Sequence, residues 1–140
     1  MRRRFGFTLV ELVVVVLILG ILAAIAAPKI INNADEAADS GAAQTLAAIR
    51  DALELYKTQA DAGGYPAGTS AQIHTKLKDY IRGTSFPKAT VGGVSSNVIK
   101  IDSGLAVSGT EGWVYDPATG DFIINSNSLT NDGVTQYSDL

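Results

Sequence analysis

The sequence contains no cysteine, one tryptophan and a single histidine, His74, among its 140 residues. The absence of cysteine excludes a disulfide scaffold, a thiolate zinc site and a cysteine nucleophile. The 11 basic and 14 acidic side chains give a net charge of −3, which excludes a generally basic nucleic-acid-binding protein. We expect the lone histidine on the surface of a short helix, and no glycine-rich phosphate loop is present. The sequence therefore predicts that the chain is not an enzyme.

Charge is almost missing from one long stretch near the N-terminus. From Phe7 to Ala27, 21 residues contain one charged side chain, that of Glu11. As a helix this stretch spans about 32 Å, close to the thickness of the hydrocarbon core of a membrane. Arg2 to Arg4 precede it, and the positive-inside rule places them in the cytoplasm. The sequence predicts a single-pass inner-membrane protein with a cytoplasmic N-terminus and its head outside.

An ordinary secretory signal peptide, cleaved near Ala24 to Ala27, is the alternative interpretation of this stretch. Three features oppose it. The apolar stretch is longer than the core of a usual signal peptide, it contains a carboxylate, and the helical pattern continues well beyond Ala27. We therefore expect a membrane helix that stays attached to the rest of the chain.

Glu11 is the most informative residue of the apolar stretch. A carboxylate inside a bilayer costs on the order of 3 kcal/mol, so it needs a partner or a purpose. The residues around it form one motif behind the short basic leader, Gly6-Phe7-Thr8-Leu9-Val10-Glu11-Leu12. This N-terminal region, from about Arg2 to Ile31, resembles the N-terminus of the type IV pilins and type II secretion pseudopilins.

The resemblance implies a role for each of three residues. Gly6 would be the last leader residue, removed by a prepilin peptidase, and Phe7 the first mature residue, which is N-methylated in this family. Glu11 would be the fifth mature residue and would pair with the new amino terminus of a neighbouring subunit. An amine and a carboxylate that are each costly in an apolar setting become tolerable together, so cleavage would favour assembly. In the unassembled monomer, Glu11 can instead extend toward the cytoplasmic interface.

Gly20 and Pro28 interrupt the helical pattern, and the missing N–H of Pro28 predicts a kink there. In the resembling family such positions let the helix bend or unwind in a filament; a kink without consequence is the alternative. After Pro28, apolar residues recur at spacings of three or four and predict an amphipathic helix that ends at Asp61 to Gly64. Its apolar positions are Ile31, Ala34, Ala38, Ala42, Leu46, Ile49, Leu53, Tyr56 and Ala60.

The sequence thus predicts four segments: a leader (1–6), a transmembrane and assembly helix (7–28), an amphipathic helix (29–62) and a globular head (63–140). In the head, a short helical pattern follows Ser70 and ends before Gly83, and β-prone runs lie at 98–101, 105–107, 113–115 and 122–124. Residues 125–140 read as irregular. The fold class is α+β, with the pilin-like arrangement of a long N-terminal helix packed on a small antiparallel sheet. The segment 112–120 also resembles a pseudopilin hairpin.

Aspartates are frequent in the C-terminal third, and some members of the resembling family bind calcium there. Asp116, Asp121 and Asp132 are the candidates, since oxygen ligands suit that ion. Their spacing matches no ligand pattern, and turn chemistry explains aspartates in loops without a metal. We therefore expect no cofactor and keep calcium as the alternative. Trp113 and Tyr115 are expected to pack the sheet.

The leading functional hypothesis is a structural subunit of a type IV pilus-like filament or a type II secretion pseudopilus. The resemblance implies as partners further copies, related minor pilins, a prepilin peptidase, an assembly platform protein and an ATPase. Nucleic acid is an unlikely partner, because removal of the leader leaves 8 basic and 14 acidic side chains, a net charge of −6. The alternative is a membrane-anchored binding module that does not polymerise and receives DNA or a secreted cargo.

Overall fold

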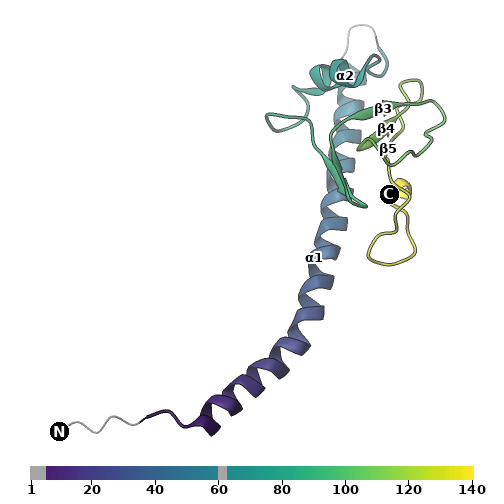
Figure 1. Cartoon of the computed structure of the whole chain (residues 1–140). Helices are drawn as coiled ribbons and strands as arrows, with labels where there is room; N and C mark the ends of the chain where they lie inside the picture. Colours follow the sequence, from purple (N-terminus) through teal and green to yellow (C-terminus); the bar gives the residue numbers. More distant parts are fainter. Residues whose placement is uncertain (1–5, 60–62) are drawn as a thin grey trace. The chain divides into compact units, whose positions relative to one another are not determined.

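The computed structural model describes residues 6–59 and 63–140, with the side chains of 31–34 left out. The predicted basic head, Arg2 to Arg4, and the predicted helix end at Ala60 and Asp61 lie outside these residues. The chain divides into two compact units, Met1–Asp35 and Glu36–Leu140. The elements, shown in Figure 1, are α1 (Leu9–Gln59), α2 (Ser70–Leu77), β1 (Ala89–Val91), β2 (Val94–Ser96), β3 (Ile99–Ile101), β4 (Trp113–Tyr115), β5 (Phe122–Ile124) and η1 (Tyr137–Asp139).

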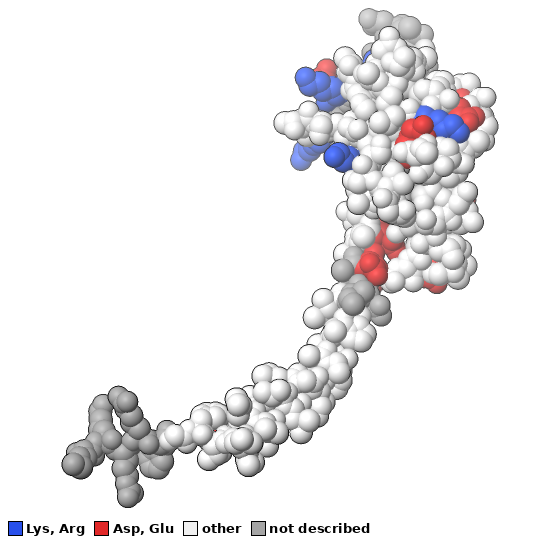
Figure 2. Space-filling model, viewed as in Figure 1, with Lys and Arg blue, Asp and Glu red and all other residues white. Residues whose placement is uncertain are grey.

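The first half of α1 is apolar and exposed. Every side chain from residue 6 to residue 30 is exposed, and Figure 2 shows this segment almost without red or blue. An 18-residue window of α1 has a mean hydropathy of 3.1, so the helix is long and apolar enough to cross a membrane. The helix runs on through Gly20 and Pro28, which therefore do not end it. The kink at Pro28 stays a prediction.

The second half of α1 is amphipathic, as its spacing predicts. Ala42, Leu46, Ile49 and Leu53 are at most 8% exposed and belong to the hydrophobic core. They lie four, three and four residues apart, so they occupy one helix face. Ala38, predicted to lie on the same face, is exposed. The part of α1 that packs into the hydrophobic core therefore begins at Ala42.

The head contains a three-stranded sheet in the order β3-β4-β5. β4 pairs antiparallel with β5, and Trp113 lies opposite Ile124. β4 pairs parallel with β3, and Ile99 lies opposite Trp113. The α+β architecture is confirmed, but this sheet is mixed rather than wholly antiparallel. The reason is that the chain between β3 and β4 crosses back before it pairs, which a tight hairpin cannot do.

Two further details differ from the sequence interpretation. The run 105–107, predicted as a strand, belongs to the loop between β3 and β4, and Leu105 has φ of 50°. An additional antiparallel hairpin, β1–β2, precedes the sheet. Its turn contains Gly92 and Gly93 with φ of 57° and 80°, values that glycine adopts at little cost.

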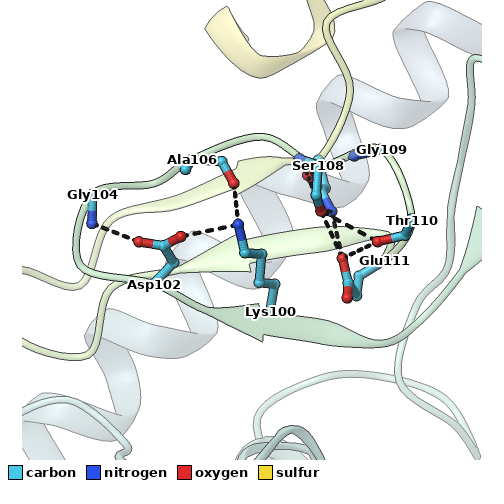
Figure 3. Close-up of polar contacts among 9 residues, drawn as sticks. Lys100, Asp102, Gly104, Ala106, Ser108, Gly109, Thr110 and Glu111 are labelled. Atoms are coloured by element: carbon cyan, nitrogen blue, oxygen red, sulfur yellow. Dashed lines mark hydrogen bonds and ion pairs between the residues drawn. The ribbon is translucent and has the colours of Figure 1, made fainter.

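Polar contacts at the end of β3 shape the start of the β3–β4 loop (Figure 3). Lys100 Nζ lies 2.9 Å from an oxygen of Asp102 and donates to the carbonyl of Ala106 at 2.5 Å. The other oxygen of Asp102 accepts from the N–H of Gly104 at 2.9 Å. The bond to Ala106 helps to hold the run 105–107 in the loop rather than in a strand.

Asn125 holds the far end of the same loop. Its side chain is fully buried, and its oxygen accepts from the N–H groups of Ser108 (2.7 Å) and Gly109 (3.2 Å). Its nitrogen donates to the carboxylate of Glu111 at 3.0 Å. Hydrogen bonds from Thr110 and Ser108 lower the pKa of Glu111. A buried amide with its donors and acceptors satisfied fixes the loop in one arrangement.

The sheet and α1 enclose an aromatic core. Trp113, Tyr115 and Phe122 are at most 1% exposed. The indole N–H of Trp113 donates to the carbonyl of Pro87 at 3.1 Å. The hydroxyl of Tyr115 donates to the carbonyl of Pro66 at 3.1 Å. The prediction that Trp113 and Tyr115 pack the sheet is confirmed.

Helix α2 begins where the sequence predicts and ends earlier. Thr69 is its N-cap and forms a capping box with Gln72. The predicted pattern extends to Ile81, but the helix ends at Leu77 and the chain continues as a turn, in which the N–H of Ile81 donates to the carbonyl of Leu77 at 3.1 Å.

The C-terminal loop at 130–135 is irregular, as predicted, yet closely bonded. The N–H of Thr130 donates to the carbonyl of Thr135 at 2.8 Å. The carboxylate of Asp132 accepts from the hydroxyls of Thr130 and Thr135, both at 2.6 Å, and from the N–H groups of Val134 (2.8 Å) and Thr135 (2.9 Å). The N–H of Asn131 donates to Asp39 of α1 at 2.6 Å. These bonds fix the loop and join it to the helix.

Gly120 supports a first prediction, because a Cβ there would lie 2.2 Å from the ring of Tyr65. Its φ is 89°, whereas Gly109 has φ of 74° and open space around it. Gly120→Ala should cost about 2–4 kcal/mol and Gly109→Ala about 1–2 kcal/mol, because only the first adds overpacking to backbone strain. Fluorescence of the buried Trp113 during urea unfolding of the full chain in detergent measures both values. Equal losses would contradict the close approach.

Asp132 supports a second prediction, on pH dependence. Hydrogen bonds from Thr130, Thr135 and the Val134 N–H hold the pKa of this carboxyl well below its ordinary value of 3.8. A lowered pKa in the folded chain stabilises it above about pH 4, and this contribution is lost as the pH falls further. The thermal midpoint of the native chain should therefore fall more steeply below about pH 4 than that of Asp132→Asn. Parallel curves for the two proteins would contradict this role.

Candidate functional site

The first functional feature is the N-terminus of α1. The helix begins at Leu9, so Thr8 is the N-cap and Glu11 the third helical residue. The hydroxyl of Thr8 accepts from the N–H of Glu11 at 3.2 Å. In return, one oxygen of Glu11 accepts from the N–H (3.4 Å) and the hydroxyl (3.3 Å) of Thr8. This reciprocal pattern is a capping box.

The capping role of Glu11 was missed in the sequence interpretation, although Thr-x-x-Glu before an apolar run signals it. Within residues 6–59 and 63–140, the hydrogen bonds of the Glu11 carboxylate all go to Thr8. These bonds are long, and Thr8 carries no charge. The carboxylate is placed at a fixed point of the helix start, and no Lys, Arg or His of the described residues forms an ion pair with it.

Gly6 and Phe7 lie immediately before the helix, in non-helical backbone. A Cβ added to Gly6 would meet nothing within 4 Å, and Phe7 is 74% exposed. The bond between the two residues is therefore in an exposed segment outside any element, where an enzyme can reach a peptide bond most readily.

The calcium candidates are each bonded within their own loops. Asp116 is 5% exposed and accepts from the N–H of Ala118 at 2.8 Å. Asp121 accepts from the hydroxyl of Thr119 at 2.8 Å, and Asp132 closes the loop described above. In the part of the chain that the structure describes, no three His, Cys, Asp or Glu side chains form a group that could hold a metal ion. The absence of a cofactor therefore stays the prediction, and calcium its alternative.

His74 is half-buried rather than fully on the surface. Its ring stacks on Phe86 with centroids 4.3 Å apart, and its Nε2 lies 2.9 Å from the carbonyl of Asn97. Burial lowers the pKa of this imidazole. The ring borders a hollow of about 320 Å³ together with Lys78 and the residues of the following turn. These contacts explain His74 as a packing residue.

Comparison with known proteins places the resemblance at the N-terminus. Residues 1–27 match the family described as the prokaryotic N-terminal methylation motif. Over 65 residues the chain is 42% identical to the type II secretion system core protein G of Aeromonas hydrophila, a match that covers 46% of this chain and 44% of that protein. Over 66 residues it is 44% identical to the same component of Pseudomonas aeruginosa, covering 47% and 45%.

A pilus component is similar to the chain as well. The type IV narrow pilus major component PilA5 of Thermus thermophilus is 43% identical over 58 residues, which are 41% of this chain and 50% of that protein. The matches span half or less of the length of these relatives. No solved structure matches the chain.

These findings confirm the resemblance that the motif around Gly6, Phe7 and Glu11 predicts. The family match includes all three residues, and the structure adds the long N-terminal helix followed by a small α+β head. The N-terminal region of this chain is therefore similar to that of type II secretion core proteins and a type IV pilus component.

Proposed function

We propose that this chain is a structural subunit of a type II secretion pseudopilus or of a related type IV pilus-like filament. One observation carries the proposal: every side chain from residue 6 to residue 30 is exposed, and from Phe7 to Ala27 the segment has one charged side chain, that of Glu11. A single apolar helix of this length is covered by lipid in a monomer and by other copies in a polymer. The role of the chain is structural rather than enzymatic.

The precursor is inserted in the inner membrane with its N-terminus in the cytoplasm and its head outside. A prepilin peptidase then cuts between Gly6 and Phe7 and removes the leader 1–6, and Phe7 is N-methylated. The match to the methylation motif and the exposure of this bond support the assignment. Cleavage removes the three arginines that hold the N-terminus at the cytoplasmic face.

Assembly depends on the pairing of Glu11 with the new amino terminus of a neighbouring copy. Each charge alone costs on the order of 3 kcal/mol inside the bilayer, and pairing relieves both. Thr8 caps the helix but cannot neutralise the carboxylate. The pairing therefore selects processed subunits and sets their axial position, while apolar contacts between helices supply cohesion.

The pseudopilus is the favoured form of the filament. Both secretion relatives described above are core components of a type II secretion system, and a chain without cysteine cannot form the C-terminal disulfide loop common in adhesive pilins. Related minor pilins, an assembly platform protein and an ATPase complete the proposed partners. Nucleic acid is not a partner, because the processed chain is acidic.

Glu11→Gln tests the assembly role, since it keeps the shape of the side chain and removes its charge. The variant should be cleaved and methylated like the native chain, yet the yield of pelleted filaments should fall at least about tenfold because the neighbouring amine is left unpaired. N-terminal mass spectrometry and filament yield give the two readouts.

Thr8→Ala is the matched control, because it removes both contacts between the Thr8 hydroxyl and Glu11 and keeps the carboxylate. We expect it to assemble nearly as well as the native chain. Normal filaments from Glu11→Gln would contradict the pairing and favour a membrane-anchored module that does not polymerise. An equal loss in both variants would reduce the role of Glu11 to helix capping.

A further inference from the structure

We infer that the C-terminal loop at 130–135 of one copy docks into a groove beside helix α1 of a second copy, with Val134 as the inserted side chain. The inference deepens the proposed function and rests on it, since the contact would join heads along the filament. Two surfaces support the inference, the loop and the groove. Each exposes an apolar side chain in the single copy, Val134 on the loop and Leu55 in the groove.

The loop presents an apolar side chain on a rigid support. Val134 is 80% exposed, the largest exposure among the big apolar residues of the described chain. The four hydrogen bonds to Asp132 and the bond from Asn131 to Asp39 fix the backbone on both sides of it. Because the loop is already ordered, docking it costs little further conformational entropy.

The groove lies along the second half of α1, between this helix and the turn that follows α2. Its volume is about 610 Å³. Leu55, on its wall, is 47% exposed although it is apolar, so covering it would be favourable. The small and apolar lining residues are Gly41, Ala48, Ala52, Leu55, Ile81 and Pro87.

The loop and the groove lie on opposite sides of α1. Asp39, which binds the loop, and Ala48, which lines the groove, are nine residues apart, and nine residues rotate a helix by about 180°. Figure 1 shows the yellow loop on one side of α1 and the chain after α2 on the other. A contact between two different surfaces is heterologous, and such a contact adds copies without limit when its rotation does not close into a ring, as a filament requires.

The charges of the two surfaces are complementary. Arg82 and Asp51 line the groove, and Lys78, Asp79 and Lys88 are exposed near it in sequence, so the three cations exceed the two carboxylates by one charge. The loop carries Asp132, and a hollow beside it is bordered by Glu36 and Asp39. Figure 2 shows Lys and Arg gathered on one side of the head and mostly Asp and Glu on the other. Two like surfaces would repel, so the occupant of the groove is the opposite side of a second copy.

A double variant, Ala48→Cys with Val134→Cys, tests the contact in filaments of the full chain. The native sequence has no cysteine, so every disulfide comes from the introduced pair. Mild oxidation should give a ladder of dimers, trimers and longer species in denaturing gels. Mixed filaments of the two single variants should give dimers only, which checks the contact where the double variant assembles poorly.

Val98→Cys with Ala48→Cys is the matched control, because Val98 is an exposed valine outside the loop, 46% exposed. It should give no ladder. Dimers from Val134→Cys alone would show a symmetric contact and overturn the inference. Filaments without any ladder or mixed dimer would overturn it and leave the proposed function standing, whereas a native chain that forms no filament overturns both.

Arg82→Glu provides a second readout of the same contact. In the Ala48→Cys, Val134→Cys background it should reduce the cross-linked fraction at least about threefold, because a carboxylate would then face Asp132. Lys76→Glu, a charge reversal on α2 outside the groove lining, should change the fraction little. Equal effects of the two reversals would contradict docking at the groove and indicate a general effect of net charge.

Discussion

Between Phe7 and Ile30, the large apolar side chains of α1 keep from 44% to 78% of their surface exposed. Burial of each such side chain contributes about 1.5–3 kcal/mol, so water is not a stable surrounding for this segment. In the proposed function, lipid covers the segment first and neighbouring helices cover it after assembly. Under that proposal the single carboxylate of the segment distinguishes the two environments, because lipid offers it no cation and a processed neighbour does.

The second half of the same helix packs against the head. One face, from Ala42 to Leu53, holds the aromatic core under the mixed sheet. Two other faces of the helix carry different features: the C-terminal loop binds Asp39 on one side, and the groove at Ala48 lies on the other. If the loop of one copy docks in the groove of the next, as we infer, this helix packs its own head on one face and contacts two neighbouring copies on the others.

Local patterns predicted the features that depend on local physics. The spacing of Leu46, Ile49 and Leu53 predicted the buried helix face. The motif at Gly6 to Glu11 predicted the match to the N-terminal methylation motif. The Thr8–Glu11 capping box and the Gly92-Gly93 turn were also visible in the sequence and were missed. Contacts between residues far apart in sequence decided the rest: Asn125 bonds to Ser108 and holds the loop that contains the 105–107 run, and Phe86 covers His74. Contacts this distant in sequence leave no local pattern.

The central claim is that the chain is processed at Gly6 and polymerised through the segment that this cut releases. The most direct test is mass spectrometry of the N-terminal peptide from filaments of the native chain, pelleted from the cell envelope or sheared from the surface. The account predicts a peptide that begins at N-methylated Phe7. Polymer that still begins at Met1, or protein cut near Ala27 and found only as a soluble head, would contradict it.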